Sequence, residues 1–147
     1  MIETHNTAIT RKGPSSPLLT LEKMGLINGE TLDYGCGRGA DGRYLQSKNI
    51  DADSYDPFWN PISLKENQYD TILCTYVLNV IEEKEEDGLL SSILSCLKPN
   101  GKAYLSVRRD VRRDGPTSRG YQRNVVLDFP VVKNKKNNFC IYELSKN

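Results

Sequence analysis

A chain of 147 residues, with 37% hydrophobic and 27% charged side chains, has the size and composition of one globular domain and is too short for two. No apolar run approaches the ~18 residues that span a bilayer, and the N-terminus has no apolar signal segment, so we expect a cytoplasmic protein without a membrane partner. The four cysteines are scattered and His5 is the only histidine, so no metal site is expected.

The formal net charge of +1 is unevenly distributed. Residues 1–100 carry 9 Lys/Arg against 15 Asp/Glu, a balance of −6, and residues 101–147 carry 11 against 4, a balance of +7. A basic C-terminal third favours an anionic substrate or nucleic acid as partner. A solvated, loop-rich surface explains the charge equally well.

The chain begins with a polar segment, residues 1–16, that contains the helix-breaking residues Gly13 and Pro14. Ser16 as N-cap and Pro17 in the first turn then predict a helix that ends at Gly25. A short strand over residues 31–34 follows, and a second helix is expected over residues 41–47.

Between that strand and the second helix lies a glycine-rich turn; residues 30–40 read E-T-L-D-Y-G-C-G-R-G-A. Glycine accepts positive φ and lets a ligand approach bare backbone, and the amides that open the next helix can face that ligand. Gly35, Gly37 and Ala40 also satisfy the loose dinucleotide fingerprint G-x-G-x-x-A. Asp33 argues against a dinucleotide, because a carboxylate suits an ammonium group better than a pyrophosphate.

A second strand is predicted over residues 49–55, and it delivers Asp56, 23 residues after Asp33. An acid at the tip of this strand can accept hydrogen bonds from ribose hydroxyls. A plain surface turn is the alternative, because Asp-Pro is ordinary turn chemistry. Residues 60–69 predict only a loop.

The remaining elements complete an α/β pattern. Residues 69–77, Y-D-T-I-L-C-T-Y-V, form the continuous apolar run of a buried parallel strand. Acidic residues 82–87 begin a long helix through Leu97, and residues 102–107 predict the next strand. Residues 125–132 and 139–144 predict an antiparallel hairpin with its turn at 133–138. We therefore expect a doubly wound, mostly parallel sheet that is reduced around strand three and ends in an antiparallel hairpin, within a single domain of residues 1–147.

Residues 108–123 form a charged connection with six arginines. It leaves the C-terminal end of a parallel strand, the edge where open α/β sheets bind ligands, and long loops in small domains are usually functional or disordered. We predict that this loop forms the substrate side, with Arg108, Arg109 and Arg119 contacting an anionic acceptor and Asp110 acting as a base. Surface ion pairs are the alternative explanation.

The chain resembles the class I S-adenosylmethionine (SAM) methyltransferases over most of its length. The resemblance rests on four segments, D-Y-G-C-G-R-G (33–39), Y-D-P (55–57), Y-D-T-I-L-C-T-Y-V-L-N-V-I (69–81) and L-K-P-N-G-K-A-Y (97–104). More narrowly, T-A-I-T-R (7–11), the Ser-x-Pro at 15–17 and V-L-N-V-I-E (77–82) look like methyltransferases associated with bacterial DNA modification islands. The [DN]-P-P-[YFW] motif of amino-group DNA methyltransferases is replaced here by C-T-Y-V (74–77), and no Pro-Cys pair occurs, so DNA base methylation by the usual machinery is disfavoured.

The resemblance implies SAM as cofactor, and a small set of residues around it. The expected cofactor-binding residues are Asp33, Gly35, Cys36, Gly37, Asp56, Pro57, Thr75, Tyr76 and, from the N-terminal segment, Arg11. Catalytic candidates are Asp110 and Tyr76, with Asn79 nearby. Two functions stay open: methyl transfer to an anionic or nucleic-acid-related acceptor, and a non-catalytic SAM-binding or nucleic-acid-associated subunit.

Overall fold

The computed structural model describes residues 13–118 and 120–147 of the chain. In chain order the elements are α1 (Ser16–Lys23), β1 (Thr31–Tyr34), α2 (Ala40–Ser47), β2 (Ala52–Tyr55), β3 (Tyr69–Thr75), a 3-10 turn η2 (Leu78–Val80), α3 (Glu83–Cys96), β4 (Leu97–Arg108), β5 (Gly115–Thr117), β6 (Gly120–Gln122), β7 (Val131–Lys135) and β8 (Phe139–Ser145).

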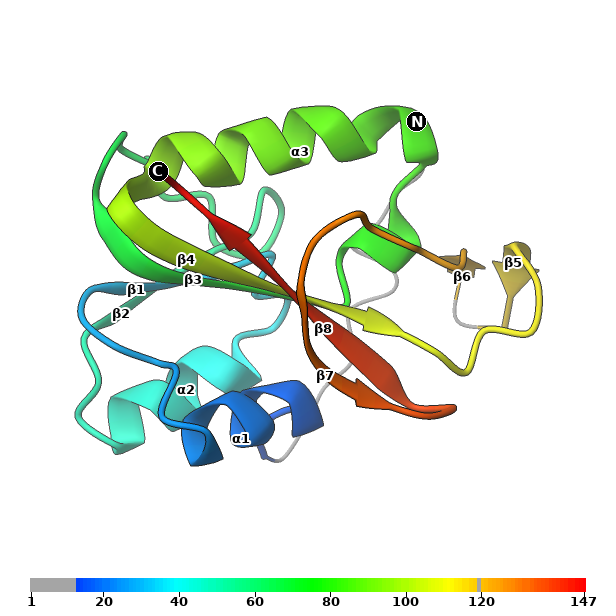
Figure 1. Ribbon diagram of the computed structural model, residues 1–147, viewed down its shortest axis with the longest axis horizontal. Helices are drawn as coiled ribbons and strands as arrows, with labels where there is room; N and C mark the ends of the chain where they lie inside the picture. Colours follow the sequence, from blue (N-terminus) through cyan, green and yellow to red (C-terminus); the bar gives the residue numbers. More distant parts are fainter. Residues whose placement is uncertain (1–12, 119) are drawn as a thin grey trace.

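Six of the strands form one sheet in the order β2-β1-β3-β4-β8-β7 (Figure 1). Strands β1 to β4 run parallel, and β8 and β7 add an antiparallel pair beyond β4. The chain order of the strands reverses beside β1, between β1 and β3. In open α/β sheets the ligand binds outside the carboxyl ends of the strands at such a switch point.

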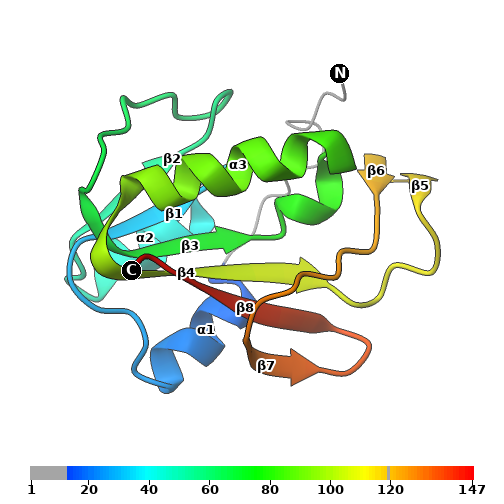
Figure 2. The same cartoon turned by 45° about the horizontal axis from the view of Figure 1, so that its top comes forward.

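Helices cover both faces of this sheet, with α1 and α2 on one face and α3 on the other (Figures 1 and 2). The alternation of side chains along β3 explains why its sequence is apolar throughout. Ile72 and Cys74 join the core cluster beneath α3, whereas Leu73 joins the cluster formed with Leu18 and Leu21 of α1. A strand that is buried on both faces has a continuous apolar sequence instead of alternating apolar and polar residues.

Helix α1 begins one residue earlier than the sequence indicated. Ser15, not Ser16, is the N-cap, and its hydroxyl oxygen accepts a hydrogen bond from the Leu18 amide at 3.4 Å. The Ser15 amide and hydroxyl also donate to the Asp41 carboxylate, both at 2.7 Å. The first turn of α2 therefore holds the start of α1, a long-range contact that sequence spacing does not reveal.

Other element boundaries also differ from the predictions. Helix α3 ends at Cys96, and β4 already begins at Leu97, because Leu97 pairs with Tyr69 and the Asn100 amide donates to the Lys146 carbonyl. Strand β7 covers Val131–Lys135 instead of 125–132, so it includes residues expected in the turn. The 108–123 segment, expected to be a loop throughout, contains the small β5–β6 hairpin.

The predicted fold class is nevertheless confirmed. Strand β1 lies at the predicted residues, and residues 57–68 contain neither a helix nor a further strand of the sheet, as expected for a sheet reduced around strand three. Within residues 13–118 and 120–147, no helix has the length and apolar character needed to cross a membrane.

Candidate active site

The glycine turn lies at the carboxyl end of β1 and is bound to the end of β2. The amides of Gly35 and Cys36 both donate to the Tyr55 carbonyl, at 2.7 and 2.8 Å. Gly35 has φ of 81°, and a Cβ atom built on it would lie 2.4 Å from a methyl carbon of Val77. Only glycine fits here, because a side chain would be both strained and in collision with the segment after β3.

Asp33 lies on β1, only 3% exposed, between Ser54 of β2 and Leu73 of β3 in the sheet register. It is two residues before Gly35, at the end of the strand beside the switch point. Its contact with a cofactor stays a prediction.

Asp56 connects the tip of β2 to the glycine turn. One carboxylate oxygen accepts from the Gly37 amide at 3.0 Å, and the other accepts from the amides of Phe58 and Trp59, each at 2.9 Å. The two explanations considered for Asp56 are therefore compatible. The carboxylate caps its own turn, and a carboxylate has about four lone-pair sites, so one remains for a ribose hydroxyl.

The surroundings of the turn shift the pKa of Cys36. Burial and the negative charges of Asp33 and Asp56 raise the pKa of its thiol to about 12. Cys36 therefore remains a neutral thiol at physiological pH. The same two carboxylates make the turn a place that favours positive charge over a pyrophosphate.

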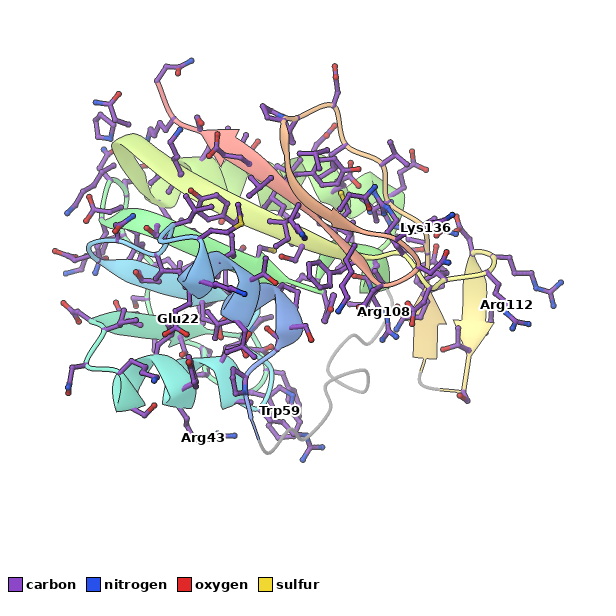
Figure 3. All side chains as sticks on the ribbon, turned by 60° about the horizontal axis from the view of Figure 1, so that its bottom comes forward. Glu22, Arg43, Trp59, Arg108, Arg112 and Lys136 are labelled. Atoms are coloured by element: carbon purple, nitrogen blue, oxygen red, sulfur yellow. The ribbon has the colours of Figure 1, made fainter. Side chains whose placement is uncertain are left out.

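A hollow of about 560 Å³ lies beside the turn, between the start of α2 and the segment after β2. Arg38, within the glycine motif, lies over the Trp59 ring at 4.5 Å from its centroid, and Arg43 also lines the hollow. Figure 3 shows Arg43 and Trp59 on the same side of the molecule. Sequence reasoning missed these residues, although an arginine inside the motif and an aromatic pair directly after Asp-Pro were the available indications.

Tyr76 follows β3 in an unusual backbone conformation. Its φ is 61°, which is uncommon for a residue other than glycine, and its amide donates to the Ser106 carbonyl at 2.8 Å. The Arg108 guanidinium lies 5.8 Å from the Tyr76 ring centroid. Thr75, the last residue of β3, pairs with Ser106 of β4, so the carboxyl ends of β3 and β4 bring Thr75, Tyr76 and Arg108 together.

Arg108 and Asp110 form a two-point ion pair. Arg108 Nε lies 2.8 Å and Nη2 2.5 Å from the two Asp110 oxygens. The Arg108 guanidinium holds the pKa of Asp110 below its usual value, and Asp110 in turn raises the pKa of Arg108. This pairing weakens Asp110 as a proton acceptor, so its predicted role as a base receives no electrostatic support.

Two other arginines of this segment have structural partners. Arg109 donates through Nη1 to the Val125 carbonyl at 2.7 Å and through Nη2 to the Tyr142 hydroxyl at 2.6 Å. Arg123 is buried, and its guanidinium binds the Ile81 carbonyl and the Glu86 carboxylate, each at 2.8 Å. The segment is therefore not a uniformly basic substrate loop; Arg11 and Arg119 lie outside the described residues.

Asn79, a candidate near the catalytic residues, is fully buried. Its side-chain amide donates to Gln122 of β6 at 2.7 Å, and its backbone carbonyl accepts from the Arg123 amide at 2.8 Å. These contacts fasten the β5–β6 hairpin to η2, so Asn79 supports the position of this hairpin.

Comparison with known protein families decides the class of this protein. A family model described as a methyltransferase domain matches residues 11–140. The chain belongs to this methyltransferase family. The sequence-based family prediction is thereby confirmed, whereas the narrower likeness to methyltransferases of DNA modification islands receives no support. A search among curated proteins gives no match.

Solved structures share the methyltransferase fold at low sequence identity. The Burkholderia thailandensis 1,6-didemethyltoxoflavin-N1-methyltransferase, with bound 1,6-didemethyltoxoflavin and S-adenosylhomocysteine, is 16% identical with a TM-score of 0.66, over 89% of this chain and 77% of that one. The glycopeptide N-methyltransferase MtfA is 11% identical with a TM-score of 0.65, over 90% of this chain and 95% of that one. A SAM-dependent methyltransferase from Archaeoglobus fulgidus is 16% identical with a TM-score of 0.52, over 63% of this chain and 52% of that one.

The extent of these matches varies. The chain spans about half the length of some structural relatives, 51% for a structure from echinomycin biosynthesis and 52% for the Archaeoglobus protein.

Proposed function

We propose that this protein transfers a methyl group from SAM to an anionic acceptor. The hydrogen bond from the Gly37 amide to Asp56 is the observation that favours SAM over a dinucleotide as cofactor. This bond occupies an amide that a pyrophosphate would need, and it puts a second negative charge beside the turn, close to Asp33. A cofactor with positively charged groups and a ribose fits these residues better than a dinucleotide.

The residues of the turn divide the binding of SAM among them. Asp33 would pair with the ammonium group of the methionine end, and Asp56 would accept a hydrogen bond from a ribose hydroxyl. Gly35, Cys36 and Gly37 would supply close backbone contact, with Thr75, Tyr76 and Pro57 along the neighbouring strand ends. When bound, SAM supplies an electrophilic methyl group on a sulfonium.

The acceptor side lies at the ends of β3 and β4. Tyr76 and Arg108 would orient the acceptor there, with Arg108 attracting its negative charge. An acceptor that reacts through an oxygen that is already ionised has no proton to lose, so it needs no general base. This chemistry agrees with an Asp110 whose pKa is lowered by Arg108. The chemical options for the acceptor thus include a small acid and a nucleic-acid group.

A second candidate is a non-catalytic SAM-binding subunit, and the same ion pair favours it. If the acceptor carries a proton that must be removed, an Asp110 held by Arg108 is a poor base. The two candidates differ in turnover, not in cofactor binding.

The test combines calorimetry with a turnover assay. We expect S-adenosylhomocysteine and SAM to bind and NAD to give no heat, and Asp33→Asn to weaken binding of SAM. Labelled SAM is then offered with cell extract, small-molecule pools, tRNA and DNA separately. Binding without transfer to any acceptor would support the non-catalytic subunit, and preferential binding of NAD would refute the SAM proposal.

A further inference from the structure

We propose that the tip of the β7–β8 hairpin and the adjacent part of the 108–123 segment form a basic surface that binds the phosphate backbone of a nucleic acid. The surface consists of Lys133, Lys135, Lys136, Arg112 and Arg113, and we refer to these residues as the tip surface. It extends the proposed function, on which it rests, because it names the class of acceptor.

The strand pairing brings the two segments of the tip surface together. Arg108, the last residue of β4, pairs with Phe139, the first residue of β8, and the Arg109 amide donates to the Asn138 carbonyl at 2.9 Å. The hairpin turn and the start of the arginine segment are therefore neighbours. Figure 3 shows Lys136, Arg108 and Arg112 at the same end of the molecule.

This end is the edge at which open α/β sheets bind their ligands. Strand β4 runs parallel to β1 and β3, so Arg108 lies at the same edge as Asp33 and Tyr76. Strand β8 runs the other way and begins at that edge. A polyanion on the tip surface would consequently lie beside the proposed acceptor side, at the opposite end of the sheet from β2.

The positive charges of the tip surface are not neutralised by neighbouring acids. All five side chains are exposed, and none takes part in an ion pair between residues that the structure describes. Of the two acids in this part of the chain, Asp110 is held by Arg108, and Asp114 accepts hydrogen bonds from the amide and side chain of Asn124. Exposed cations that form no ion pair among the described residues favour an anionic partner.

The arrangement suits a polyanion better than a small acid. A small ligand is normally enclosed by groups that converge in a concave pocket, whereas these five side chains are exposed and distributed over two segments. Lys133 and Lys135 lie on the same face of β7, about 6.6 Å apart along the strand. Repeated phosphates match repeated cations, and each neutralised phosphate adds to affinity by releasing counterions.

Lysines on an edge strand also prevent strands of different molecules from pairing, and β7 is an edge strand. That role explains Lys133 and Lys135, but it does not explain Lys136 in the turn or the two arginines on the neighbouring segment. The acids at the start of α3 lie on the other face of the sheet, where Glu86 binds Arg123 (Figure 1). They would repel a polyanion from the face of the sheet that α3 covers.

The experiment measures binding of labelled 20-nucleotide probes by fluorescence anisotropy, with single-stranded DNA, duplex DNA and single-stranded RNA as separate arms. The test variant is Lys133→Ala/Lys135→Ala/Lys136→Ala. The matched control, Lys23→Ala/Lys48→Ala/Lys65→Ala, removes the same charge from exposed lysines that precede β1, β2 and β3 and so lie toward the opposite edge of the sheet. Calorimetry with S-adenosylhomocysteine is run on every variant.

We expect at least one probe to bind at 50 mM salt, with affinity that falls linearly on a log–log plot against salt. The test variant should bind at least about tenfold more weakly, and on duplex DNA its salt slope should be smaller by about 2 to 3, as expected for three lost phosphate contacts. The control should bind like the wild type. The three arms decide between DNA and RNA as the source of the phosphates.

Equal loss in the test and control variants, or no binding of any probe at 50 mM salt, would overturn the tip surface as a nucleic-acid site. Retained binding of S-adenosylhomocysteine in the test variant would show that its loss of probe binding does not come from unfolding. If the test variant fails to fold, Arg112→Ala/Arg113→Ala gives the same comparison with an expected slope change of about 2. Failure of cofactor binding in the wild type would instead count against the proposed function.

Discussion

The proposed cofactor side and the proposed acceptor side of this sheet edge are built in different ways. At the cofactor side, the Asp56 carboxylate accepts from the Phe58 and Trp59 amides, two and three residues further along the chain, and from the Gly37 amide of the glycine turn, 19 residues before it. At the acceptor side, arginines that look alike in the sequence differ in their burial and in their partners. Arg123 is buried against Glu86, Arg108 is paired with Asp110, and Arg112 is exposed. The residues of the first region follow a recognisable sequence pattern, whereas in the second a contact with a distant segment distinguishes the buried Arg123 from the exposed Arg112.

The largest effect is expected at the cofactor side, from Gly35→Ala. A positive φ for a residue with a side chain and a collision with Val77 should together lower the free energy of unfolding by about 3–5 kcal/mol and abolish binding of S-adenosylhomocysteine. Urea unfolding and calorimetry measure the two effects. Gly88→Ala is the control, because Gly88 lies in α3 with open space around it, and alanine there should stabilise by about 0.5–1 kcal/mol. Unchanged binding in Gly35→Ala would remove the turn from the cofactor site.

The second prediction tests whether the arginines of the acceptor side differ in their contribution to the free energy of unfolding. Arg123→Ala leaves Glu86 and the Ile81 carbonyl without their partner, so we expect a loss of about 3 kcal/mol in the free energy of unfolding. Arg112→Ala, at an exposed position in the same segment, should change it by less than about 0.5 kcal/mol. Similar values for both variants would mean that the segment behaves as one uniformly exposed loop.

Asp56→Ala should affect both stability and binding. The carboxylate accepts three backbone hydrogen bonds, and their loss should lower the free energy of unfolding by about 2 kcal/mol. Binding of S-adenosylhomocysteine should weaken at least about tenfold. Asp56→Asn keeps one oxygen acceptor and should lie between wild type and alanine in both measurements. Full cofactor affinity in Asp56→Ala would make Asp56 a turn residue only.

The smallest effect is expected from the exposed Arg108–Asp110 pair. The pKa of Asp110 is lower in the folded protein than in the unfolded chain, so its stabilisation is present above the unfolded pKa, about 3.9, and is lost as pH falls through the lowered folded pKa. At this exposure the pair should contribute about 0.2–1 kcal/mol. Comparing the unfolding free energies of wild type and Asp110→Asn at neutral and at acidic pH tests this, because the difference should shrink in acid. A difference that grows in acid would contradict the assignment.

Much of the glycine turn could be predicted from the sequence, because its glycines and acids form a recognisable pattern. Glycines at alternate positions, an acid two residues before them and another at the tip of β2 predict a turn by the conformations and charges of the residues themselves. The run Y-D-T-I-L-C-T-Y-V (69–77) likewise predicts a strand buried on both faces, and β3 covers its first seven residues, Tyr69–Thr75. Strand β1 also lies where the pattern indicated.

Only the tertiary structure decided the rest. Ser15 became the cap of α1 because Asp41 binds it, and β4 begins at Leu97 because Tyr69 pairs with that residue. Arg123 is buried because its guanidinium binds Glu86, 37 residues away in the chain. Each outcome depends on which distant groups the folded backbone brings within hydrogen-bonding distance. Spacing in the sequence carries the conformation of a turn, but it does not carry the identity of such partners.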